Sequence, residues 1–113
     1  MAKNEYGVKL DSNGYAPSIV PGHGEWQCYG CGRNRNLERH EIYGGAFRRK
    51  SKEYGLWVHL CPLCHREGEE AVHRRGGYWL KADGQGAAMD TYGWTVDEFR
   101  QRFGKNYLDG EVE

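Results

Sequence analysis

Four regularly spaced cysteines are the residues of this chain that most clearly indicate chemistry. They form two Cys-x-x-Cys pairs, Cys28 with Cys31 and Cys61 with Cys64, separated by 29 residues. A two-residue gap lets both thiolates of one tight turn bind the same ion, and two such turns complete the tetrahedral four-sulfur shell that zinc prefers. We therefore predict one structural Zn²⁺ ion bound by all four cysteines.

Two disulfides are the alternative use of the same four thiols. The sequence shows no signal peptide and no hydrophobic run of membrane length, so nothing indicates an oxidising compartment. Gly30 and Gly32 also flank the second cysteine, where a zinc-binding turn commonly needs positive φ or close backbone approach. We favour zinc on these grounds, and we expect a cytoplasmic protein without a membrane partner.

The apolar composition predicts a small core that needs a structural metal ion for its stability. Leu, Ile, Val and Phe together number 18 of 113 residues, below the roughly 20% that marks chains unable to build a full core. Zero formal net charge, together with four Trp and eight Tyr, argues against disorder and for a core patched with aromatic rings. A structural zinc contributes on the order of 10 kcal/mol to folding, comparable with the whole stability of a small domain.

The segment between the cysteine pairs is predicted to form a hairpin. Residues 38–47 and 54–60 read as two strands, joined by a basic, polar loop at 48–52. The second strand alternates three aliphatic residues on one face, which leaves His59 on the other. We therefore interpret His59 as a strand-face residue, or as one that contacts a metal ligand from behind, rather than as a metal ligand itself.

The second cysteine pair is predicted to open a helix. Pro62 follows Cys61 directly, and the fixed φ of proline suits the first turn of a helix. Cys64 and His65 should then lie early on that helix. A cysteine turn, a hairpin and a helix with the second cysteine pair predict a small α+β fold, a zinc-stapled treble-clef or ββα-metal domain with C-terminal helices.

The chain divides into four parts. Residues 1–25 are rich in glycine and proline and are expected to be irregular, whereas residues 26–76 hold the zinc-bound core. Residues 77–108 are predicted to be a helical segment that packs on this core, and residues 109–113 an acidic tail. The whole is one domain, as its length indicates.

Two helices are predicted in the C-terminal segment. Residues 78–92 read as a helix weakened by two glycines. Thr95 and Glu98 form a capping box that begins a second helix, which Gly104 ends. Its aromatic side chains, four residues apart, are interpreted as core rather than as a cofactor pocket.

Three short motifs occur in an order that is specific, although each is common alone. They are Cys28-x-x-Cys31, Arg39-His40-Glu41-Ile42 before Gly44-Gly45, and Leu60-Cys61-x-x-Cys64-His65. In these motifs the chain resembles the HNH, or ββα-metal, endonucleases over about residues 26–108. Residues 50–73 and 92–108 are more similar still to small phage-encoded members, a branch similar to the recombination-enhancing, RecA-dependent nucleases.

The resemblance implies a metal-dependent DNA endonuclease of phage or prophage origin, acting in the cytoplasm of a bacterial host. DNA is the implied partner, and a recombinase or other phage protein is a further one. The implied role is phage recombination or DNA processing.

The resemblance also implies roles for three histidines. A neutral imidazole with a pKa of about 6.5 can take a proton from water at physiological pH, and His40 is the candidate general base. A divalent cation, Mg²⁺ or Mn²⁺, would stabilise the charge on the scissile phosphate and the leaving oxygen, with His65 as one ligand. His73 is the favoured second ligand, and Glu69, four residues after His65, is the alternative.

Two positions depart from the pattern of the family. Leu56 stands where the middle asparagine of the motif is usual, and Arg39 precedes the candidate base where an acid is common. Glu41, as a substitute acid, should lie on the opposite strand face from His40. A treble-clef DNA-binding or adaptor module without catalysis is therefore the alternative function, and a purely structural zinc ribbon is a third that leaves the histidines unexplained.

Positive charge gathers around the predicted hairpin although the net charge of the chain is zero. From residue 33 to residue 52 there are seven Arg or Lys against two Glu, a local balance of +5. Such side chains bind phosphates without choosing a sequence, whereas a solvated basic loop is the alternative. The candidate DNA contacts are Arg39, Arg48, Arg49, Lys50, Lys52 and Arg66.

Overall fold

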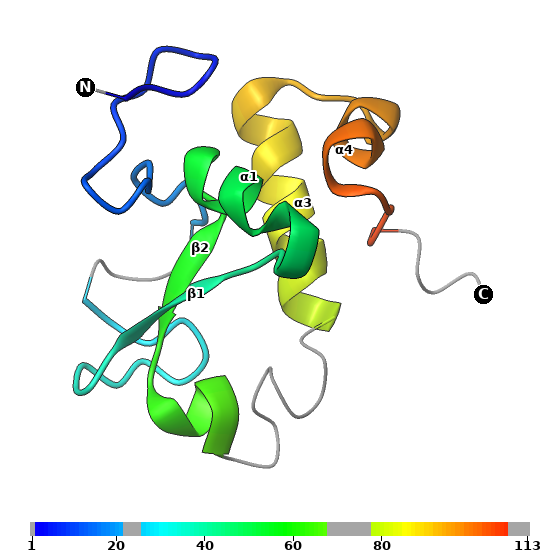
Figure 1. Cartoon of the computed structure of the whole chain (residues 1–113). Helices are drawn as coiled ribbons and strands as arrows, with labels where there is room; N and C mark the ends of the chain where they lie inside the picture. Colours follow the sequence, from blue (N-terminus) through cyan, green and yellow to red (C-terminus); the bar gives the residue numbers. More distant parts are fainter. Residues whose placement is uncertain (1, 22–25, 68–77, 109–113) are drawn as a thin grey trace.

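The computed structural model describes residues 2–21, 26–67 and 78–108. Its elements are strand β1 (Glu38–Glu41), a 3-10 turn η1 (Gly45–Phe47), helix α1 (Arg48–Glu53), strand β2 (Trp57–Leu60), a π-helical segment η2 (Leu63–Glu67), and helices α3 (Tyr78–Tyr92) and α4 (Val96–Phe103). Figure 1 shows α3 alongside the hairpin and α4 after it, near the end of the chain. The protein is a small mixed α+β fold, as the sequence predicts.

The hairpin separates two faces that matter for function. Strands β1 and β2 pair antiparallel, with His40 opposite Val58 and Arg39 opposite His59. Opposed residues share a face and successive residues alternate between faces, so His40 and Arg39 lie on different sides of the hairpin. The side of His40 leads into the core, because Val58 is fully buried.

The predicted loop at 48–52 is wrong, because the structure has helix α1 there. Both strands are accordingly shorter than predicted. The segment is a run of residues with no glycine or proline, and Arg49 pairs with Glu53 at i, i+4. Tertiary contacts hold the helix in place, since the buried hydroxyl of Ser51 accepts from the backbone N–H of Tyr43 and donates to the carbonyl of Leu56.

The segment after Cys61 is helical, as predicted, although it is wound as a π-helix. The backbone N–H of His65 donates to the carbonyl of Cys61 at 2.9 Å. Because β2 ends at Leu60, the hairpin leads directly into this helical segment. Cys64 and His65 are thereby positioned by the end of β2.

Both C-terminal helices are confirmed. Helix α4 begins with the predicted capping box of Thr95 and Glu98 and ends at Gly104. Gly84 allows helix α3 to pack closely on the core, because a Cβ there would lie 2.8 Å from the hydroxyl of Tyr43. Within the described ranges, no helix is both long and apolar enough to cross a membrane.

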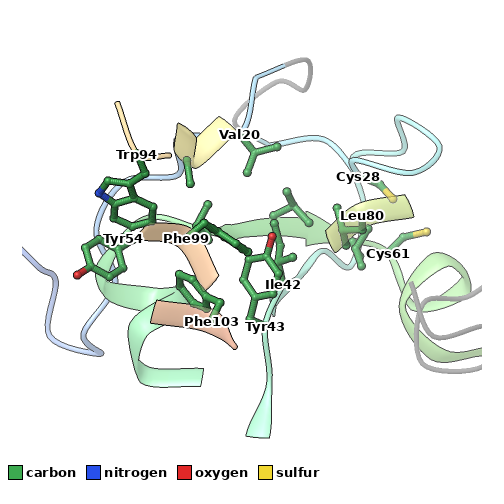
Figure 2. Close-up of a cluster of buried hydrophobic side chains, with 14 residues drawn as sticks. Val20, Cys28, Ile42, Tyr43, Tyr54, Cys61, Leu80, Trp94, Phe99 and Phe103 are labelled. Atoms are coloured by element: carbon green, nitrogen blue, oxygen red, sulfur yellow. The ribbon is translucent and has the colours of Figure 1, made fainter. Parts of the chain in front are cut away.

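The core lies between the hairpin and the two C-terminal helices (Figure 2). Phe99 and Phe103 of α4 stack with ring centroids 5.0 Å apart, and Tyr43 packs edge-on against Phe99. Cys28 and Cys61 belong to the same buried cluster. The candidate metal centre is therefore continuous with the core, and not an appendage to it.

The N-terminal segment contains only an isolated bridge between Lys3 and Lys9, with no regular strand or helix among residues 2–21, as predicted. It is nevertheless well anchored to the hairpin. The indole N–H of Trp57 donates to the carbonyl of Ala16 at 2.7 Å, and the hydroxyl of Ser18 donates to the carbonyl of Trp57. This segment covers the side of the hairpin that faces away from His40.

Candidate functional site

The four cysteines converge on one point although the two pairs are far apart in the sequence. Their Sγ atoms all lie within 4.8 Å of one another, and all four are free thiols. The Cys31 and Cys61 sulfurs are 3.7 Å apart, close to the edge of about 3.8 Å of a tetrahedron with Zn–S bonds of about 2.3 Å. Cys28, Cys31, Cys61 and Cys64 could thus hold one metal ion.

The first cysteine turn has the backbone that such a site requires. The N–H of Gly32 donates to the carbonyl of Cys28 at 2.9 Å, and Gly32 has φ of +82°. Gly30 serves a different purpose, since a Cβ there would lie 2.9 Å from the Cys64 sulfur. One glycine makes the turn and the other leaves space for the second cysteine pair.

The backbone also prepares Cys28 to become a thiolate. Burial raises the pKa of the Cys28 thiol, but backbone N–H groups of Cys61, Cys31 and Gly30 outweigh it and lower this pKa to about 7. At Cys64, burial is the larger influence and raises the pKa of the thiol. Metal binding would therefore displace a proton more readily at Cys28 than at Cys64.

Helix α3 is tied to the first cysteine turn by Tyr29. The Tyr29 hydroxyl donates to the Asp83 carboxylate at 2.8 Å, and its ring stacks on Trp79 with centroids 6.1 Å apart. The backbone N–H of Tyr29 donates to the carbonyl of His59 at 2.8 Å. The turn therefore bridges β2 and α3.

A second polar cluster lies on the face of the hairpin that carries His40. The ring centroids of His40 and His65 are 5.0 Å apart and nearly edge to face. Nδ1 of His65 lies 2.7 Å from a carboxylate oxygen of Glu38, and the two side chains are 15% and 31% exposed. Glu38, His40 and His65 form what we call the histidine cluster.

Glu38 is the member of this cluster that the sequence analysis missed. It stands two residues before His40, so strand alternation places both on one face. The i, i+2 spacing was the available signal. Glu41 lies on the other face, as expected, where it accepts from the Tyr15 hydroxyl and from Nε of Arg48 at 2.8 Å.

Other predicted site residues lie elsewhere or outside the described part. Leu56, at the position of the family asparagine, is fully buried and offers no polar atom to the cluster. His59 lies on the opposite face from His40, consistent with its interpretation as a strand-face residue. His73 and Glu69 lie outside the described residues, as does the side chain of Arg66.

Three of the predicted DNA contacts gather around Tyr15 and Glu41, on the face of the hairpin away from the histidine cluster; they are Arg39, Arg48 and Lys52. Arg39 faces away from the histidine cluster and pairs with Asp11 at 3.0 Å. On α1, Arg48 and Arg49 are 63% and 89% exposed. Lys50 donates to the carbonyl of Arg102 at 3.2 Å, and Lys52 donates to that of Asn13 at 3.4 Å.

No protein-family model matches this chain, and no curated protein or solved structure is significantly similar to it. Its function is therefore inferred from the geometry of the described residues.

Proposed function

We propose that this protein is a metal-dependent DNA endonuclease of the ββα-metal type. The observation that carries the proposal is the placement of His40 and His65, whose ring centroids are 5.0 Å apart. One lies on the hairpin and the other directly follows a cysteine of the candidate metal centre. Two imidazoles at this separation can act on a single phosphate, one as a base and one as a ligand.

Zinc is the metal that best fits the cysteine centre. Four thiolates in two short turns match its preferred tetrahedral shell, and the near-ideal distance between the sulfurs of Cys31 and Cys61 supports this geometry. An ion held by the four cysteines would join the first cysteine turn to η2. In this treble-clef arrangement, its role is to hold η2, and with it His65, against the hairpin.

His40 is the general base of the proposed reaction. It is half-buried on β1, where the strand fixes its backbone. The neutral ring takes a proton from the attacking water, and the hydroxide formed attacks the phosphorus. Among the described residues, His65 is the other imidazole at this position, and it contacts Glu38.

Glu38 and His65 form the ligand side of the site. A carboxylate that accepts from Nδ1–H fixes the tautomer of the ring and leaves the lone pair of Nε2 available for a cation. Bound Mg²⁺ or Mn²⁺ would neutralise charge on the phosphate and on the leaving oxygen. The second ligand is still expected to be His73, with Glu69 as the alternative.

Helix α1 supplies the exposed cations for DNA. Arg49 is 89% exposed, and its charge is available for phosphates without loss of packing. The resemblance to phage nucleases suggests a role in recombination or DNA processing in the bacterial cytoplasm, with a recombinase or other phage protein as partner.

A plasmid-nicking assay tests the proposal. The zinc-loaded protein, supplied with Mg²⁺ or Mn²⁺ and any recombinase it requires, should nick DNA, and His40→Ala should lower the rate at least 100-fold, as is typical for loss of a general base. His65→Ala should be partly restored by excess Mn²⁺, because it weakens a ligand site. Equal cleavage with and without His40 would refute the mechanism.

A DNA-binding module without catalysis is the second candidate. The observation that favours it is Leu56, whose fully buried side chain replaces the polar residue usual in the family. Such a module would bind DNA through the same cations and would not nick DNA, whichever metal is added and whichever histidine is replaced. The nicking assay separates the two candidates.

A further inference from the structure

A cavity of about 340 Å³ lies on the side of the hairpin opposite the histidine cluster. Its lining includes Asp11, Tyr15, Trp26, Arg39, Trp57 and His59. The volume is near the lower end of small-ligand sites, which begin at about 300 Å³. It is formed where the N-terminal segment crosses the hairpin, and the proposed nuclease reaction uses none of its residues.

The aromatic wall of this cavity is held rigidly at its base. Trp57 donates its indole N–H to the carbonyl of Ala16 at 2.7 Å, and its ring meets His59 at 89° with centroids 5.2 Å apart. Both rings are more than nine-tenths buried. Trp26 stacks on His59 at 5.4 Å but is 66% exposed, so it presents a large open ring surface to a ligand.

The polar rim of the cavity combines a fixed donor and a fixed acceptor. The guanidinium of Arg39 lies 4.3 Å from the ring centroid of Tyr15 and donates to Asp11 at 3.0 Å. The Asp11 carboxylate also accepts from the backbone N–H groups of Asn13 and Tyr15, both at 2.9 Å. Both charged groups remain partly exposed and can contact the edge of a flat molecule.

We propose that this cavity binds an unpaired nucleobase of a DNA strand. A nucleobase is flat and aromatic, and it carries donors and acceptors on its edge, which match the tryptophan surface and the Arg39–Asp11 rim. Only an unpaired and unstacked base exposes its ring face and its Watson–Crick edge, and stacking on aromatic side chains is the usual way in which single strands are held. The choice of DNA as the source of the base rests on the proposed function.

The cavity and the histidine cluster lie on opposite faces of the same strand. Arg39 and His40 are consecutive residues of β1 with side chains on opposite faces. The cavity and the cluster are thus back to back on a two-stranded hairpin. A strand held by a base at Trp26 would have to pass around an edge of the hairpin to reach the proposed site of cleavage.

Anisotropy with labelled oligonucleotides tests this proposal. The zinc-loaded protein, without added Mg²⁺ or Mn²⁺, is titrated into a thymidine oligonucleotide of about ten residues, a length within the range of single-strand sites. An abasic oligonucleotide of equal length and free thymidine monophosphate are measured in parallel. Trp26→Ala should weaken binding of the thymidine oligonucleotide about tenfold, the scale of losing one stacked base, and Trp26→Phe should restore most of it.

Trp79 provides a matched control. It is also an exposed tryptophan, 46% accessible, and it stacks on a neighbouring ring, but it does not line the cavity. Trp79→Ala should leave binding unchanged. Neither variant removes a buried side chain, so loss of folding is not expected, and melting curves check this point.

The outcomes are distinct. Equal effects of Trp26→Ala and Trp79→Ala, or an abasic strand that binds as tightly as the thymidine strand, would overturn the proposal. Free thymidine monophosphate that binds as tightly as the strand would support the base pocket and identify a soluble nucleotide as its ligand. If nicking depends on His40 but DNA binding does not depend on Trp26, only the proposed base pocket is rejected. If DNA binding depends on Trp26 but no nicking occurs, only the proposed nuclease function is rejected.

Discussion

Replacement of Glu38 is the sharpest test of the histidine cluster. In the structure, its carboxylate lies 2.7 Å from Nδ1 of His65. If this contact sets the tautomer of the ring, Glu38→Ala should remove the preference for Nδ1–H and leave Nε2 less available to a cation. Glu38→Gln should keep part of the effect, because the amide oxygen can still accept from Nδ1–H.

The size of the effect follows from the exposure of the pair. Loss of a carboxylate behind a histidine ligand typically costs 10- to 100-fold in metal affinity, or about 1.4 to 2.7 kcal/mol. Glu38 is 31% exposed and His65 15% exposed, so water can replace part of the lost hydrogen bond. We therefore expect the lower half of that range, about a 10- to 30-fold increase in the Mn²⁺ concentration needed for half-maximal nicking.

Two measurements check this prediction. Nitrogen chemical shifts of the His65 ring at about pH 8, where free imidazole is neutral, should report Nδ1–H in the wild type and a mixture in Glu38→Ala. In Glu38→Ala, the Mn²⁺ concentration needed for half-maximal nicking should rise as described, and the nicking rate at saturating Mn²⁺ should be close to that of the wild type. Glu41→Ala is the control, since Glu41 lies on the other face of β1. An unchanged tautomer in Glu38→Ala would refute the reasoning.

Three further predictions concern the metal, the DNA and the pH dependence. Cys31→Ser should release the ion and unfold the domain, because the contribution of a structural zinc, roughly 10 kcal/mol, equals the stability of a small domain. Zinc content and melting temperature measure this effect. His40→Ala is the control, and it should leave zinc content and melting temperature unchanged. Neutralising Arg48, Arg49 and Lys50, the three cations at the start of α1, should flatten the salt dependence of DNA binding by up to about three phosphate contacts. Salt titrations measure this slope, and an unaltered slope would mean that α1 faces away from DNA. The pKa of Asp11 is lowered from its ordinary value, first by the hydrogen bond from the backbone N–H of Tyr15 and also by Arg39, so the stability it contributes is present above about pH 4 and is lost as the pH falls through the lowered pKa. Asp11→Asn should reduce the acid sensitivity of the melting temperature, and identical curves for both proteins would contradict this.

The sequence by itself determined the features that depend on short-range chemistry. The spacing of the two cysteine pairs was enough to predict that their sulfurs would gather, because two thiols on one tight turn can share an ion with a second such pair. The capping box at Thr95 and the end of the helix at Gly104 were also predictable, since caps are satisfied within one helical turn.

Only the tertiary structure decided which side chains meet across the hairpin. Helix α1 was predicted as a loop because its stabilising contact, the hydroxyl of Ser51 between two strand ends, comes from pairing that no local pattern records. The contact of Glu38 with His65 spans 27 residues, and that of Trp57 with Ala16 spans 41. Such contacts form only when strand register and the path of the N-terminal segment are both set. For this reason the sequence predicted the candidate residues His40 and His65, whereas the Glu38 contact and the aromatic cavity behind them required the fold.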